Sequence, residues 1–151
     1  MNVHQARPAE ILLVEDSPAD ILLTREGFEE SKILANLHVV EDGQAALDYL
    51  QRAKERDDTV VPDLILLDLN LPKKGGIEVL QVIKSDPELR RLPVVMLTTS
   101  DDEVDVLESY DSHANSYITK PIDFEQFTQV VRTLEDFWFS IVRLPARNAS
   151  P

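Results

Sequence analysis

The sequence predicts an α/β protein built as a doubly wound parallel sheet, and three observations lead to this fold class. Short apolar runs alternate with amphipathic stretches along the chain, as they do in successive βαβ units. The apolar runs are nearly continuous, which is the pattern of strands buried on both faces of a sheet. The chain has 151 residues, of which 43% are hydrophobic, so it is long enough for one such domain and its core.

The first strand and helix are marked by a sharp change in composition. Residues 11–14 are apolar, and two acids, Glu15 and Asp16, follow them. Ser17 and Pro18 then fit an N-cap residue and a proline at the first helical position. We expect this helix to continue to about residue 32. Its helical stripe is formed in part by Ile21, Leu22, Arg25 and Phe28.

The next two strand–helix pairs follow the same order. Residues 37–40 are expected to form a strand that ends at a Glu-Asp-Gly sequence, and residues 44–53 a helix. A polar connector precedes the most hydrophobic run, the Leu-Ile-Leu-Leu of residues 64–67, which stops at Asp68. A loop rich in proline, glycine and lysine then leads to a helix over residues 77–84. The buried face of the earlier helix is expected to consist of Ala45, Ala46, Leu47 and Leu50.

The last two pairs complete an alternation of five strands with five helices. Strands are expected over residues 93–97 and 117–119, with a helix over residues 101–110 between them. From residue 123 onward apolar side chains keep helical spacing as far as residue 141. Five strands joined by right-handed crossovers favour a flavodoxin-like (βα)5 sheet of strand order 2-1-3-4-5, here with an extended C-terminal helix.

These elements leave little of the chain unassigned. We expect one domain over residues 10–145, which includes the extended last helix, between flexible ends at residues 1–9 and 146–151. The last of these segments is too short for a DNA-binding or catalytic output domain. The expectation is therefore a stand-alone domain.

Composition and charge exclude several classes of function. The formal net charge is −13, which argues against a nucleic-acid partner and against docking on an anionic membrane. The chain has no cysteine, which excludes disulfides, thiolate metal sites and cysteine nucleophiles. No apolar run approaches the ~20 residues of a membrane span, and the first ten residues lack the apolar stretch of a secretory signal. We expect a cytoplasmic protein.

Polar residues suited to phosphoryl chemistry follow four of the expected strands. Glu15 and Asp16 follow the first strand, Asp68 the third, Thr98 the fourth and Lys120 the fifth. In sheets of this kind ligands bind outside the carboxyl ends of the strands, so these side chains are expected to converge. Carboxylates packed this closely repel one another unless a cation intervenes, and ligands with oxygen atoms only suit Mg²⁺. A carboxylate is also able to act as a nucleophile towards phosphorus.

The sequence resembles the receiver domain of bacterial two-component response regulators in four motifs. They are Val-Glu-Asp at residues 14–16, Leu-Leu-Asp-Leu-Asn-Leu-Pro at 66–72, Leu-Thr at 97–98 and Tyr-Ile-Thr-Lys-Pro at 117–121. The resemblance extends over residues 11–134. It implies a phosphoacceptor with only self-directed phosphotransfer and autodephosphorylation, and not an enzyme in the usual sense.

The resemblance also implies a role for each motif residue at the acidic end of the site. Asp68 accepts a phosphoryl group from a phosphohistidine of a sensor histidine kinase. Asp16 and Asp68 bind Mg²⁺ directly, Glu15 acts largely through water, and the backbone carbonyl of Asn70 completes the protein ligands.

Four further residues have implied roles in binding the phosphoryl group and in the switch that follows. Lys120 pairs with the phosphoryl group, and the bond that joins it to Pro121 is expected to be cis. Thr98 moves to hydrogen-bond a phosphoryl oxygen, and the aromatic ring of Tyr117 turns inward into the space that Thr98 leaves.

Several stretches resemble a narrower group, the small response regulators paired with phytochrome photoreceptor kinases. They lie at residues 69–74, 97–100, 109–115 and 135–138. This resemblance implies a phytochrome as the phosphodonor, while the downstream protein stays unidentified. Apolar side chains beyond the core predict a homodimer through the last helix; they are Phe137, Trp138, Phe139, Ile141 and Val142.

Two other functions compete with this interpretation. A haloacid-dehalogenase-like phosphatase also forms an aspartyl phosphate, but it needs a second acid two residues after the nucleophile, where this chain has Asn70. A pseudo-receiver would bind partners without being phosphorylated, and its usual signature is loss of the acidic pair, the acceptor or the lysine. This chain has all of them. The three histidines, His4, His38 and His113, are expected to be structural or superficial.

Overall fold

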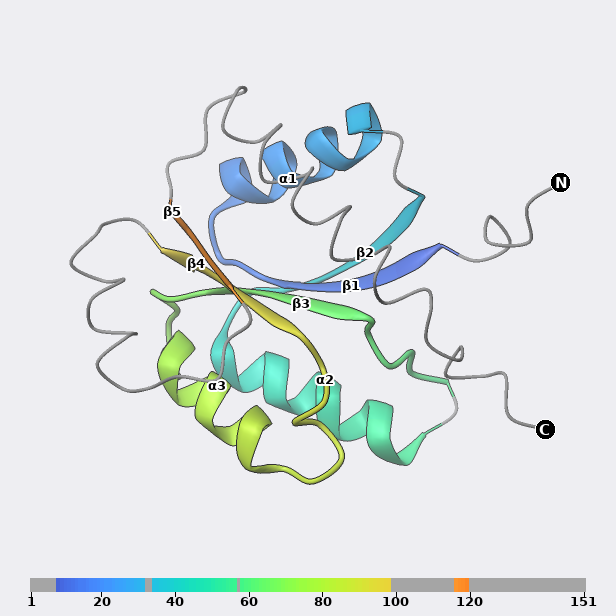
Figure 1. Ribbon diagram of the computed structural model, residues 1–151. Coiled ribbons are helices and arrows are strands. Elements are labelled where there is room, and N and C mark those ends of the chain that lie inside the picture. Colours follow the sequence, from blue (N-terminus) through green and yellow to red (C-terminus); the bar gives the residue numbers. More distant parts are fainter. Residues whose placement is uncertain (1–7, 32–33, 57, 99–115, 120–151) are drawn as a thin grey trace, which may run out of the picture.

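The computed structural model describes residues 8–31, 34–56, 58–98 and 116–119 of the chain. The described residues form a five-stranded sheet in the order β2-β1-β3-β4-β5, and every neighbouring pair of strands is parallel. In Figure 1, helix α1 covers one face of the sheet while α2 and α3 cover the other. The predicted fold class and strand order are therefore confirmed.

The elements agree with the expected ones to within a residue or two at each end. The strands are β1 (Ala9–Val14), β2 (Ala35–Val40), β3 (Leu64–Asp68), β4 (Val94–Thr98) and β5 (Ser116–Thr119). The helices in the described part are α1 (Pro18–Ser31), α2 (Gly43–Glu55) and α3 (Gly76–Ser85). The helices expected over residues 101–110 and beyond residue 123 lie outside the described residues.

Strands β1 and β2 begin two residues before the positions expected from their apolar runs. The early residues Glu10 and Asn36 are polar and fall outside the apolar runs, but they are partners in the β1–β2 ladder. Their side chains hydrogen-bond, since the Asn36 amide donates to Oε2 of Glu10 over 3.0 Å. His38 reaches Oε1 of the same carboxylate over 2.7 Å, in keeping with its expected structural role.

Two apolar clusters cover the two faces of the sheet and explain the continuous apolar runs. Alternate strand residues point to opposite faces, so a doubly covered strand needs apolar side chains at every position. On the face of α2 and α3 the cluster includes Leu12, Val14, Leu50, Ile65, Leu67, Val79, Ile83 and Met96. On the face of α1 it includes Ile11, Leu13, Phe28, Leu64, Leu66, Val95 and Leu97.

The expected stripe of α1 is wrong at two positions, Leu22 and Arg25, which are both exposed. Phe28 is buried and Ile21 packs against the core cluster on this face of the sheet. Leu22 is 57% exposed. It directly follows Ile21, and successive residues of a helix point about 100° apart, so both cannot face the same sheet.

An ion pair joins the two helices on the other face. Nζ of Lys54 in α2 lies 2.8 Å from Oδ2 of Asp86, the C-cap residue of α3. The hydrogen bond from Lys54 is the main cause that holds the pKa of Asp86 below its usual value, and the same bond raises the pKa of Lys54. Oδ1 of Asp86 also accepts backbone hydrogen bonds from Glu88 and Leu89, over 2.8 and 3.2 Å.

No helix among the described residues is long and apolar enough to cross a membrane.

The Lys54–Asp86 pair predicts a pH-dependent contribution to stability. Because the pKa of Asp86 is lowered by folding, the pair stabilises the protein above the ordinary value of 3.8, and this stabilisation is lost as the pH falls through the lower folded value. We expect Asp86→Asn to lower Tm by about 2–4 °C at pH 7, measured by circular dichroism. The difference from the wild type should shrink steadily below pH 3.8.

Asp58→Asn serves as the matched control. Asp58 pairs with Arg56 over 3.4 Å, but both side chains are exposed, so its removal should leave Tm nearly unchanged at either pH. A loss of Tm in Asp86→Asn that persists undiminished in acid would contradict the electrostatic origin of the effect.

Candidate metal centre

The sheet topology brings acids from distant parts of the chain to one edge. In the β1–β3 ladder Val14 is the partner of Leu67, and each is followed by an acid: Glu15 directly after β1, and Asp68 as the last residue of β3. Asp16 comes one residue later, just before α1 begins at Pro18. Parallel strands end at the same edge of a sheet, which is where ligands bind in this architecture.

Three carboxylates meet at this edge. Ligand oxygens of Glu15, Asp16 and Asp68 all lie within 4.8 Å of one another, and we call these three residues the acidic cluster. Glu15 is 1% exposed and Asp68 3% exposed, whereas Asp16 faces solvent. Like charges this close destabilise the fold unless a cation or a proton neutralises them. The donor set consists of carboxylate oxygens, which fits a hard divalent cation such as Mg²⁺.

Backbone hydrogen bonds orient the two buried carboxylates. The N–H of Asn70 donates to Oδ1 of Asp68 over 3.3 Å. The N–H of Ser17 donates to Oε2 of Glu15 over 3.3 Å. Oγ of Ser17 in turn accepts from the N–H of Asp20 over 3.3 Å, as expected for the residue that caps α1.

The backbone around Asp68 is fixed from both sides. Strand pairing continues one residue past the acid, because the N–H of Leu69 donates to the carbonyl of Leu97 over 2.8 Å. Helix α3 begins against the same backbone, since the N–H of Gly76 donates to the carbonyl of Leu69 over 2.9 Å. A Cβ atom on Gly76 would lie 2.3 Å from the carbonyl oxygen of Asp68, so a side chain has no room there.

Comparison with known proteins identifies the family to which this fold and its acidic cluster belong. The family model described as "Response regulator receiver domain" matches residues 11–132. The chain belongs to the response regulator receiver domain family.

Its relatives include small phytochrome response regulators. Response regulator Rcp1 of Synechocystis sp. is 49% identical over 139 residues, which cover 92% of this chain and 95% of that protein. The crystal structure of the phosphorylated cyanobacterial phytochrome response regulator RcpA aligns with a TM-score of 0.78 at 48% identity, over 93% of this chain and 100% of that one. The Mn²⁺-bound form of Rcp1 aligns with a TM-score of 0.76 at 49% identity, over 92% and 100%. The narrower resemblance seen in the sequence is confirmed.

The receiver-domain motif residues fall into a described and an undescribed set. Asp68 is the β-ladder partner of Leu97, so the backbone of Thr98 follows directly beside the acid. Tyr117 lies in β5 as the partner of Met96. Other expected site residues lie outside the described part of the chain; they are Lys120, Pro121, Phe137, Trp138, Phe139, Ile141 and Val142.

Sequence reasoning missed the two glycines that set the backbone near the acceptor. The chain has only four glycines, and Gly43 and Gly76 both lie within contact of the segment that follows Asp68. The available signal was that α2 and α3, which both follow acids at the ends of strands, each begin with a glycine. It was not used, because the sequence alone did not show which backbone each glycine approaches.

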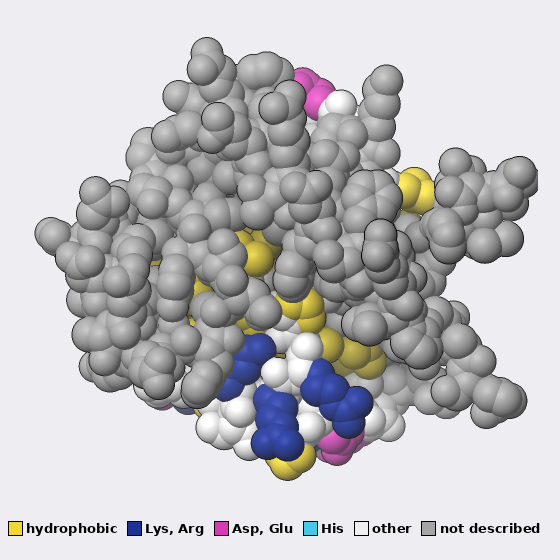
Figure 2. Space-filling view, viewed as in Figure 1, with side chains coloured by type: hydrophobic (Ala, Val, Ile, Leu, Met, Phe, Trp, Pro, Cys, Tyr) yellow, Lys and Arg dark blue, Asp and Glu magenta, His cyan; other side chains and the backbone are white. Residues whose placement is uncertain are grey.

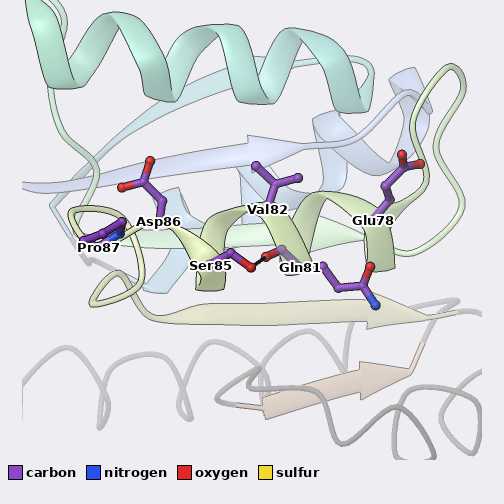
Figure 3. Close-up of a pocket in the computed structure, with 6 residues that line it drawn as sticks. All are labelled: Glu78, Gln81, Val82, Ser85, Asp86 and Pro87. Atoms are coloured by element: carbon purple, nitrogen blue, oxygen red, sulfur yellow. Dashed lines mark hydrogen bonds between the residues drawn. The ribbon is translucent and has the colours of Figure 1, made fainter.

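A surface pocket on the described part of the chain is separate from this site. A surface pocket of about 470 Å³ lies along the outer side of α3 and the turn after it, between Glu78 and Pro87 (Figure 3). None of the acidic cluster lines it. The space-filling view shows Lys and Arg side chains gathered over the part of the molecule where α3 lies (Figure 2).

Repulsion within the acidic cluster predicts an unusual gain of stability on mutation. We expect Asp16→Asn to raise Tm by about 2–4 °C in the presence of a chelator, because one of three neighbouring charges is removed. The same variant should lose most of the rise in Tm that Mg²⁺ gives to the wild type. Both effects are measurable by scanning calorimetry.

Asp20→Asn is the control, since Asp20 is the acid in the first turn of α1 and lies outside the cluster. It should not raise Tm, because a negative charge at a helix N-terminus is stabilising. If Asp16→Asn has an unchanged or lower Tm without metal, the result would argue against charge repulsion within the acidic cluster.

Proposed function

We propose that the protein is a single-domain response regulator that accepts a phosphoryl group on Asp68 and thereby changes its contacts with other proteins. The observation that carries the proposal is the convergence of Glu15, Asp16 and Asp68 at the carboxyl edge of a receiver-family sheet. Asp68 is the acceptor because it ends the central strand with its backbone held on both sides. A nucleophile fixed in this way loses little freedom when the donor approaches.

The transfer itself requires little from the protein beyond position and charge. A carboxylate oxygen of Asp68 bonds to the phosphorus of a phosphohistidine on a sensor histidine kinase. The phosphorus–nitrogen bond breaks, and its electron pair stays with the imidazole, which takes up a proton. Hydrolysis of the resulting acyl phosphate by water returns the carboxylate.

The acidic cluster would hold the divalent cation that this chemistry uses. Asp16 and Asp68 would supply direct ligands, Glu15 would act largely through water, and the backbone carbonyl of Asn70 would complete the protein ligands. A bound Mg²⁺ neutralises charge on the phosphoryl oxygens. The Mn²⁺-bound form of the relative Rcp1 supports a divalent cation in this family.

The remaining motif residues have roles in recognising the phosphoryl group. Lys120 pairs with its oxygens, next to an expected cis bond to Pro121. Thr98 hydrogen-bonds the phosphoryl group, and the ring of Tyr117 then turns inward. The β4 register supports the role of Thr98, because it directly follows the ladder partner of Asp68.

The relatives suggest the kinase partner, and the apolar residues expected in the last helix suggest a homodimer. A phytochrome-type histidine kinase is the proposed phosphodonor, because Rcp1 and RcpA are close in sequence and RcpA is named a phytochrome response regulator. We propose one domain over residues 10–145 that forms a homodimer through its last helix. The residues of that interface are Phe137, Trp138, Phe139, Ile141 and Val142.

The two competing functions have less support. A phosphatase of the haloacid-dehalogenase type needs an acid where this chain has Asn70, whose amide is unable to shuttle a proton. A pseudo-receiver would have no use for three converging carboxylates.

Phosphorylation of the intact protein tests the proposal. With Mg²⁺ and either a phytochrome kinase with radiolabelled ATP or acetyl phosphate, the wild type should gain one acid-stable, base-labile phosphoryl group. Asp68→Asn should gain none, because a carboxamide is not a nucleophile towards phosphorus. Asp48→Asn, an exposed acid of α2, should be labelled like the wild type.

Beryllofluoride with Mg²⁺ gives an independent readout. It should shift the amide resonances of the wild type and leave those of Asp68→Asn in place. Equal labelling, or an equal response, of the two proteins would favour the pseudo-receiver instead.

A further inference from the structure

The segment that follows the phosphoacceptor rests on the start of α2. We call residues 69–75, between β3 and α3, the acceptor loop. The N–H of Gly43, the first residue of α2, points at the carbonyl oxygen of Pro72 in this loop over 3.5 Å. The same oxygen accepts a hydrogen bond from the N–H of Lys74 over 2.7 Å. One carbonyl therefore links the turn of the loop to the helix.

The turn in the acceptor loop is strained. Lys73 has a φ of 68°, in the left-handed region, and the hydrogen bond from Lys74 to Pro72 closes the tight turn around it. A γ-turn of this hand is rare, and a residue with a side chain adopts it only where its surroundings hold it. The neighbours that hold it here lie at the start of α2 and at its N-cap.

Gly43 approaches the loop too closely for any other residue. A Cβ atom at this position would lie 2.1 Å from the carbonyl oxygen of Lys74 and 2.7 Å from its Cβ. Gly43 is also buried, so a methyl group could not turn away into solvent. An alanine would push the loop outward by about an ångström, because non-bonded carbon and oxygen atoms need more than 3 Å.

Asp42 strengthens the same junction. Its Oδ1 caps α2 by accepting from the N–H of Ala45 over 2.7 Å, and its Oδ2 lies 3.6 Å from Nζ of Lys73. Lys73 is 72% exposed, so this ion pair adds little by itself. The cap matters more, because it fixes the turn of backbone that carries the N–H of Gly43.

The end of the acceptor loop that leads into α3 is closely packed and has no space in which to move. Gly76 lies so close to Asp68 and Leu69 that a Cβ there would be 2.3 Å from the carbonyl oxygen of one and 2.7 Å from Cα of the other. A push at Lys74 is therefore transmitted back along the loop towards Asn70. The N–H of Asn70 holds the carboxylate of Asp68.

We propose that Gly43 is a positioning residue of the metal and phosphoryl site, which acts through the acceptor loop on Asn70 and Asp68. The inference rests on the proposed function, since it assigns the cation to the acidic cluster and to the carbonyl of Asn70. Gly43 itself touches neither the cluster nor the donor. Its contribution is the absence of a side chain where the loop must pass.

The experiment compares Mn²⁺ binding to Gly43→Ala and Gly75→Ala, measured from the free-ion signal in electron paramagnetic resonance with Mg²⁺ as competitor. We expect Gly43→Ala to weaken binding about tenfold, as changes behind the direct ligands of a metal commonly do. Gly75 has a φ of −67° and nothing within 4 Å of its added Cβ, so Gly75→Ala should bind within about twofold of the wild type.

Ile83→Val separates positioning from stability. Ile83 is fully buried in α3, and its shortening should lower Tm without changing the Mn²⁺ affinity. If Gly43→Ala does not fold, Asp42→Ala takes its place, with an expected loss of about threefold in affinity. Asp42→Asn should restore binding, because an amide oxygen still caps α2.

If Gly43→Ala and Asp42→Ala both bind Mn²⁺ with wild-type affinity while the wild type is still phosphorylated on Asp68, the positioning role of Gly43 is overturned. The proposed function is then unaffected. Failure of the wild type to bind Mn²⁺, or equal binding by Asp68→Asn, would overturn it together with the proposed function.

Discussion

The parallel pairing of β1 with β3 is the constraint on which the rest of this structure depends. Its register sets Val14 beside Leu67, and so places the acids that follow them at the same edge. The resulting cluster of carboxylates opposes folding when no cation is bound. The two apolar clusters on the faces of the sheet supply the stabilisation that keeps it together. The stability of the core thus holds together a charge arrangement whose repulsion a bound cation relieves.

The structure also fixes the position of the backbone around Asp68. Asp68 ends a strand, its neighbour Leu69 is still paired with β4, and α3 starts against both. On the other side, α2 approaches the acceptor loop at Gly43. The helices α2 and α3 are in turn joined by the ion pair between Lys54 and Asp86. The site is therefore also held by α2 and α3, which carry none of the three carboxylates.

The sequence was sufficient for the fold and for the acidic cluster, because both follow from apolar runs and from what stands at their ends. It was less reliable where polar residues continue a strand, as Glu10 and Asn36 do by bonding to each other. It failed at Leu22 and Arg25, because the apolar stripe of α1 is weak and does not fix which side faces the sheet. It did not reveal Gly43, since the contact that excludes a side chain there joins residues far apart in the chain.

The most direct test of the central claim is where a divalent cation binds. Substoichiometric Mn²⁺ broadens the amide resonances of nearby residues in two-dimensional NMR spectra of the full chain. The account predicts broadening centred on residues 15–17 and 68–70, with no effect on Asn36 at the start of β2, near the opposite edge of the sheet. Broadening centred instead on the acids near the end of α1, such as Glu29 and Glu30, would contradict it.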